Sequence, residues 1–108
     1  MDGADFIAPT SCSVIGFKGV GRSTIAETIQ VTLFKGSFVN ASSASISLTQ
    51  IGEMEQVVAA NTNYFFTGSF TSGNTLTEND FVMTTVKKST DNGTAYIYVN
   101  GHLELQYT

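Results

Sequence analysis

Apolar and polar residues alternate along several stretches of the chain, as they do in β-strands that bury one face and expose the other. The clearest stretch is 28–34, in which Ile29, Val31 and Leu33 alternate with threonine and glutamine. It is followed by the polar sequence 35–37, KGS, which is expected to end the strand. The pattern predicts a half-buried strand whose outer face carries hydroxyl and amide groups.

Four further strands are expected where β-branched and aromatic residues are bounded by turn-forming residues. They are residues 13–17, 44–51, 64–71 and 81–88. The second is expected to bury Ile46 and Leu48 and to stop at Gly52. The third and fourth are separated by the turn-rich sequence SGNTLTEND, so they are expected to pair with each other antiparallel.

The last segment, 95–108, contains Asn100-Gly101, the strongest sequence signal for a two-residue hairpin turn. That turn would pair Val99 with His102 and place apolar and polar side chains on one face. The alternation instead continues through the glycine, with apolar residues at odd positions and polar residues or tyrosines at even ones. We prefer one long strand bent at Gly101. A three-residue loop over 100–102 preserves the alternation as well, and the sequence leaves it open.

Strands at such short and regular spacing predict an all-β chain folded as an antiparallel, jelly-roll-like β-sandwich. The competing helix, residues 23–30 with Ser23 as N-cap, is short and runs directly into β-branched residues. Residues 22–27 are therefore assigned to a loop or a single turn. Residues 1–12, which include the only proline, Pro9, are expected to form a short extended N-terminal arm. Residues 13–108 then form one sandwich domain.

The composition excludes several kinds of chain and partner. Of the 108 residues, 42% are hydrophobic and only 13% are charged, so the chain is expected to fold. A net charge of -4, with no basic run longer than Lys87-Lys88, gives no electrostatic basis for nucleic-acid binding. The single cysteine, Cys12, cannot form an internal disulfide, which fits synthesis in a reducing compartment. No signal peptide or membrane-spanning stretch is apparent, so no membrane partner is expected.

Residues 16–23, GFKGVGRS, nearly match the phosphate-binding loop G-x-x-x-x-G-K-[ST]. Arg22 replaces the lysine that would reach the phosphates, and no βαβ pattern follows. We interpret the segment as a mobile glycine-rich loop and predict no nucleotide or other cofactor.

The chain has one histidine, His102, and structural zinc needs four nitrogen or sulfur ligands. Both His102 and Glu104 are expected on the solvated face of the last strand. Turns at 78–80 and 91–93 carry oxygen ligands of the kind that bind calcium, but the same residues form turns without a metal. We predict no metal site, no catalytic residues and no enzymatic activity, since neither a triad nor paired carboxylates are found.

Several aromatic side chains are expected on faces opposite the main apolar sets, where they could contact a sugar or another subunit. A weakly charged surface with exposed tyrosines is typical of subunit interfaces, so subunit contact is favoured over carbohydrate binding. The arm is expected to act as a clasp on the partner. The predicted interface residues are Phe6, Ile7, Pro9, Phe65, Tyr96 and Tyr98.

Four segments carry a resemblance to a known group of proteins, and they read TIQVTLFKGS, ASISL, NTNYFFTGSFTSGNTLTENDFVMTTVKK and HLELQYT. With these in place, the stretch from about Val14 to Tyr107 resembles the small jelly-roll domains of tailed-bacteriophage virions. These include head decoration (cement) proteins and the tips of tail fibres. The resemblance lies in strand rhythm rather than in a diagnostic motif, and no catalytic residues come with it.

The resemblance implies a non-enzymatic structural virion protein, assembled in the host cytoplasm, that binds the major capsid protein or another virion protein as a homotrimer. A small domain without disulfides also gains stability by burying a face against copies of itself. The alternative is a fibre-tip domain that binds a receptor or cell-surface glycan through Tyr96, Tyr98, Asn74 and Asn79. Because the sequence starts at Met1 and has no repetitive stalk, a complete decoration protein is the preferred expectation.

Overall fold

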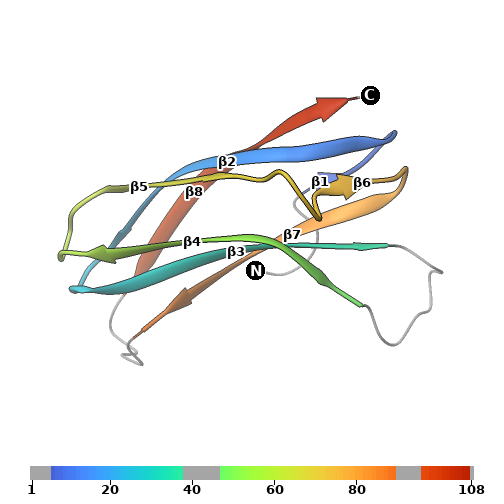
Figure 1. Ribbon diagram of the computed structural model, residues 1–108. Helices are drawn as coiled ribbons and strands as arrows, with labels where there is room; N and C mark the ends of the chain where they lie inside the picture. Colours follow the sequence, from blue (N-terminus) through green and yellow to red (C-terminus); the bar gives the residue numbers. More distant parts are fainter. Residues whose placement is uncertain (1–5, 38–46, 90–95, 108) are drawn as a thin grey trace.

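The computed structural model describes residues 6–37, 47–89 and 96–107, and within these ranges it contains β-strands and no helix (Figure 1). The strands are β1 (Phe6–Ile7), β2 (Cys12–Ser23), β3 (Glu27–Ser37), β4 (Thr49–Val58), β5 (Tyr64–Ser69), β6 (Thr75–Leu76), β7 (Asp80–Lys88) and β8 (Ile97–Tyr107). Their pairings are antiparallel. The predicted all-β class with antiparallel sheets is confirmed.

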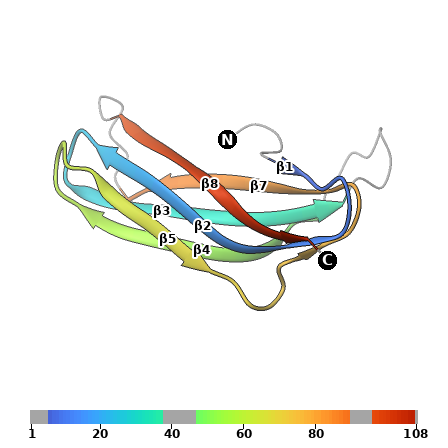
Figure 2. The ribbon, with the colours of Figure 1, turned by 90° about the horizontal axis from the view of Figure 1, so that it is seen from above.

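Two sheets lie face to face (Figures 1 and 2). Sheet A has the strand order β1-β7-β3-β4. Sheet B has β2 at its centre, with β8 on one side and β5 and β6 on the other. The molecule is a slab with extents of 40 × 30 × 18 Å. Two stacked sheets therefore account for its shortest dimension.

The core lies between the sheets and consists of the inward residues of the alternating stretches. Ile29, Val31 and Leu33 of β3 are fully buried, as the alternation predicts. They share one cluster with Val14 and Phe66 of sheet B. Burying an apolar side chain of this size contributes about 1.5–3 kcal/mol, so this row accounts for much of the attachment of sheet A to sheet B. Residues 35–37 still pair with β7, and the strand ends at Ser37, within the segment expected to end it.

The glycine-rich segment 16–23 is part of β2, a 12-residue strand and the middle strand of sheet B. The interpretation of this segment as a mobile loop is therefore wrong, and so is the expected end of the strand at Phe17. A Cβ atom on Gly21 would lie 2.6 Å from Cε1 of Phe66. Glycine here makes room for a core aromatic ring rather than ending the strand.

The strand expected over 44–51 differs from the strand that is observed. β4 begins at Thr49 and continues through Gly52, and Leu48 is 41% exposed rather than buried. The predicted core residue Ile46 lies outside the described residues. Gly52 does not stop the strand, because it pairs with Leu33 of β3, and the ring of Phe70 occupies the space that a Cβ atom on Gly52 would take. The residues of β4 that are buried are Ile51, Met54 and Val58.

The expected pairing of the strands at 64–71 and 81–88 is wrong. β5 pairs with β2 in sheet B, whereas β7 pairs with β1 and β3 in sheet A. The turn-rich connection between them crosses from one sheet to the other and contains β6 and Asn74. The buried side-chain amide of Asn74 donates hydrogen bonds to the carbonyls of Val14 (2.8 Å) and Phe70 (3.1 Å). This residue fixes the crossing and is not free to contact a glycan.

The preferred interpretation of the last segment is confirmed. Residues 97–107 form one continuous strand, paired along its length with β2, so neither hairpin at Asn100-Gly101 is present. Tyr98, Asn100, His102 and Glu104 share the outer face, and the odd-numbered residues face sheet A. Phe65, Tyr96 and Tyr98 are exposed, as expected.

The described part of the predicted arm, residues 6–12, joins the sandwich. Phe6 and Ile7 pair with Val82 and Phe81 of β7, and Ala8 is fully buried. The N–H of Ala8 donates to the carbonyl of Asp80 (2.8 Å). Residues 6–7 are therefore held as an edge strand of sheet A, whereas Cys12 already belongs to β2 of sheet B.

Residues 24–26 connect β2 to β3 and cross from sheet B to sheet A without a helix. The connection is a loop, as expected, but it is shorter than the predicted 22–27, because residues 22–23 belong to β2 and residue 27 to β3. The buried hydroxyl of Ser23 donates a short hydrogen bond to the buried carboxylate of Glu27. The same hydroxyl accepts a bond from the N–H of Ile25 (3.2 Å). These two hydrogen bonds of Ser23 thus stabilise the connection between the sheets, and Ser23 does not cap a helix.

Candidate functional site

One long edge of the sandwich, between β4 and β5, is closed. The side-chain amide of Gln56 on β4 donates a hydrogen bond to the carbonyl of Phe65 on β5 (2.8 Å). Directly after the end of β4, the N–H of Ala59 donates a hydrogen bond to the hydroxyl oxygen of Tyr64 (3.1 Å). These bonds join the two sheets along this edge.

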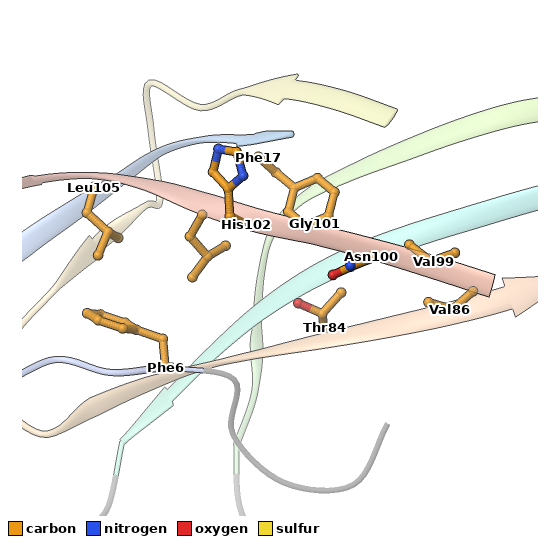
Figure 3. A pocket seen from close by; sticks show the side chains of 10 residues that line it. Phe6, Phe17, Thr84, Val86, Val99, Asn100, Gly101, His102 and Leu105 are labelled. Carbon is orange, nitrogen blue, oxygen red and sulfur yellow. The ribbon is translucent and has the colours of Figure 1, made fainter. Parts of the chain in front are cut away.

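The opposite edge, between β7 and β8, is open. A groove of about 490 Å³ runs between the two strands (Figure 3). Val99, Leu103 and Leu105 point from β8 towards sheet A but are only partly buried, and Val86 of β7 is 39% exposed. The main apolar side chains of its walls are Phe6, Phe17, Val86, Val99, Leu103 and Leu105.

Phe17 and Gly101 determine the shape of the groove wall on sheet B. The ring of Phe17 lies across Gly101, where a Cβ atom would be 2.6 Å from Cζ of the ring and 2.7 Å from the carbonyl oxygen of Lys18. Because the second contact is with backbone, no larger residue fits at position 101 without a shift of the strands. Between Val99 and Leu103, β8 therefore adds no side chain to the layer between the sheets.

The outer face of sheet B is the second notable surface. Val20, Phe65 and Tyr98 are 41%, 74% and 58% exposed there. Val20 and Phe65 border a shallow depression of about 400 Å³, whose polar lining comes from Lys18, Thr67, Asn100 and His102. The ammonium nitrogen of Lys18 lies 3.6 Å from a carboxylate oxygen of Glu104, so these two charges compensate each other, and Arg22 of β2 adds a positive charge to the same face.

The six predicted interface residues do not form one patch. Phe65 and Tyr98 share the outer face of sheet B, on either side of β2. Phe6 lines the groove. Ile7, 51% exposed, and Pro9, also exposed, lie at the edge of sheet A, and Tyr96 is exposed just before β8.

The potentially reactive groups are far apart. Cys12 is opposite Tyr107, whereas His102 is opposite Lys18, so the two lie six residues, or about 20 Å, apart along β2. Burial raises the pKa of the Cys12 thiol, which disfavours the nucleophilic thiolate. Within the described ranges, no three histidine, cysteine, aspartate or glutamate side chains are grouped to bind a metal.

The acidic turn at 78–80 is built by hydrogen bonds within the protein. One carboxylate oxygen of Asp80 accepts from the backbone N–H (3.0 Å) and the hydroxyl (3.1 Å) of Thr77, and the other accepts from the hydroxyl of Ser37 (2.7 Å). Burial alone would raise the pKa of Asp80, but these bonds and the charge of Lys35 together lower it. The exposed Asn79 adopts the left-handed backbone conformation that the turn requires, with a φ of 71°. The second acidic turn, 91–93, lies outside the described residues.

The sequence did not reveal the groove. Its alternation correctly places Val99, Leu103 and Leu105 on the inner face of β8, but the pattern is the same whether the opposite sheet covers that face fully or in part. The packing of β1 and β7 against β8 decides this, and no local sequence signal encodes it.

The described residues include no helix capable of spanning a membrane. Comparison of the chain with known proteins found no matching family model, curated protein or solved structure.

Proposed function

We propose that the protein is a non-enzymatic structural protein of a tailed-bacteriophage virion. In this proposal it is a jelly-roll-like capsid decoration protein that binds the major capsid protein as a homo-oligomer and stabilises the shell. The observation that carries the proposal is the outer face of sheet B, where Val20, Phe65 and Tyr98 are exposed among few charges. A surface of this kind favours protein contact, because desolvating it costs little and buries aromatic area.

The outer face of sheet A differs from that of sheet B and supports the choice of docking face. Its exposed side chains are mostly polar: the amide of Gln30 donates to the carboxylate of Glu53 (2.7 Å), and Glu55 and Lys87 lie nearby. Val57 and Ile7 are its strongly exposed large apolar residues among those described, at 76% and 51%. Sheet B then faces the shell and sheet A faces solvent.

Binding of this kind stabilises a shell by linking neighbouring capsid subunits. A specific contact buries about 1,200–2,000 Å² in total, and a few central aromatic residues supply most of its free energy. On this basis Phe65, the most exposed aromatic of the described face, is the expected centre of the contact.

The test is co-sedimentation with shells assembled from the major capsid protein of the phage that encodes this chain. Phe65→Ser and Val20→Ser are each expected to weaken binding about tenfold or more, which is about 1.4 kcal/mol. Val57→Ser is the matched control, since it removes an equally exposed apolar side chain from sheet A. Absence of wild-type binding at micromolar protein, or an equal loss in the control, would refute the proposal.

A second candidate function rests on the depression beside Phe65. An aromatic side chain next to Asn100 and His102 matches the mixed apolar and polar lining of small-ligand sites, as a fibre-tip domain binding a receptor glycan would require. Binding to a glycan array that Asn100→Ala abolishes would favour this function. An array without hits would remove it.

A further inference from the structure

The open edge of the sandwich offers a contact that the proposed function leaves unassigned. We propose that this edge is an interface between two copies of the chain, in which β8 of one copy pairs antiparallel with β8 of the other. The inference rests on the proposed self-association and names the surface responsible for it. It adds a two-fold contact, whereas the phage resemblance implies three copies.

β8 is the least protected edge strand of the described chain. Proteins usually guard free edges with charges, prolines, bulges or short strands. β4 carries Glu53 and Glu55, β7 carries Lys87 and Lys88, and β5 is only six residues long. β8 has eleven residues, pairs on one side with β2, and contains neither lysine, arginine nor proline. Its one carboxylate, Glu104, lies beside Lys18 of its own sheet.

The alternation along β8 makes the strand complementary to itself. In an antiparallel pair centred on His102, Val99 faces Leu105 of the other copy and Gly101 faces Leu103. Polar residues meet polar residues or tyrosines on the outer face in the same register, because Asn100 faces Glu104. A two-fold axis through this point brings the two grooves side by side, so each shields the apolar wall of the other.

The size of the open edge fits such a pair. Eleven residues extend about 37 Å at about 3.4 Å each. With the 18 Å thickness of the slab, the edge presents about 670 Å² per copy. Two copies bury about 1,300 Å² in total, which lies within the range of about 1,200–2,000 Å² for specific interfaces. A ring of three would divide the same edge between two neighbours, and each contact would then be too small.

The test is the native mass of the full chain, measured by light scattering and sedimentation at protein concentrations from about 0.1 to 100 µM, a range that spans dimer dissociation by mass action. We expect a dimer of twice 11.5 kDa that dissociates on dilution. His102→Lys places two ammonium groups opposite each other at an exposed position, and Leu103→Lys places one in the groove. Each is expected to raise the dimer dissociation constant at least tenfold. Gln50→Lys on the edge strand β4 is the control and is expected to leave the dimer intact.

His102 is exposed, so His102→Lys keeps the test valid even if Leu103→Lys impairs folding. A monomer at the highest concentration, a trimer, or a dimer that both β8 variants leave intact would overturn the inference. None of these outcomes decides shell binding, which the co-sedimentation of Phe65→Ser measures separately. A monomer that binds shells would refute the edge contact alone. A dimer that the β8 substitutions weaken but that does not bind shells would refute the virion role alone.

Discussion

Gly21→Ala tests whether the glycine-rich segment is a core strand or a mobile loop, because the two interpretations predict opposite signs. In the strand, the new methyl group would lie 2.6 Å from Cε1 of Phe66 and 3.2 Å from Cγ2 of Val99. Carbon atoms prefer separations of about 3.5–4.0 Å, so the ring must move by about 1 Å. Phe66 is only 1% exposed and cannot swing into solvent.

Overpacking of this kind costs about 1–3 kcal/mol. Replacing glycine with alanine also restricts the unfolded chain, which by itself raises the free energy of unfolding by about 0.4–1 kcal/mol. The net expectation is a loss of about 0.5–2 kcal/mol in the free energy of unfolding. In a mobile loop only the second effect operates, and the variant would be slightly more stable than the parent.

The assay is urea unfolding followed by circular dichroism. At an m-value of about 2 kcal/mol/M, a loss of about 1 kcal/mol lowers the midpoint by about 0.5 M. In a Phe66→Leu background, the loss of unfolding free energy caused by Gly21→Ala is expected to be smaller by about 0.5 kcal/mol or more, because the narrower leucine side chain can move away from the new methyl group. A Gly21→Ala midpoint at or above that of the parent would refute the packing argument.

Three further predictions concern the polar and ionisable groups. Ser23→Ala removes the hydroxyl that donates to the buried Glu27 carboxylate, so urea unfolding is expected to show a loss of about 1–3 kcal/mol, against no change for the exposed Ser69→Ala. The lowered pKa of Asp80 means that its hydrogen bonds stabilise the fold above about pH 4 and lose this effect as the pH falls through the lowered pKa. Urea midpoints measured from neutral to strongly acidic pH are therefore expected to fall less steeply for Asp80→Asn, and identical slopes would contradict the assignment. Because burial raises the pKa of Cys12, a thiol reagent at mildly alkaline pH is expected to react slowly with the folded protein and quickly in urea. Equal rates would contradict its burial.

Much of the strand content could be predicted from the sequence alone. The side chains of β3 and β8 face where the alternation placed them, and the parity argument correctly excluded a two-residue turn at Asn100-Gly101. The three-residue loop that preserves the same parity is excluded only by the pairing of β8 with β2. Alternation is a local property of the backbone, because successive side chains of a strand point to opposite faces whatever the strand pairs with. The exposure of Phe65, Tyr96 and Tyr98 followed from the same rule.

The tertiary structure decided what depends on residues distant in the chain. Gly21 and Gly52 continue their strands because both pair with neighbouring strands, and aromatic rings from β5 and from residue 70 occupy the space above them. A glycine by itself does not indicate whether it ends a strand or admits a ring. Strand pairing placed β5 and β7 in different sheets although a turn-rich segment joins them. The groove arises in the same way, since Leu103 and Leu105 face inward by local geometry, but how far they are covered depends on β1 and β7, which are distant in the chain.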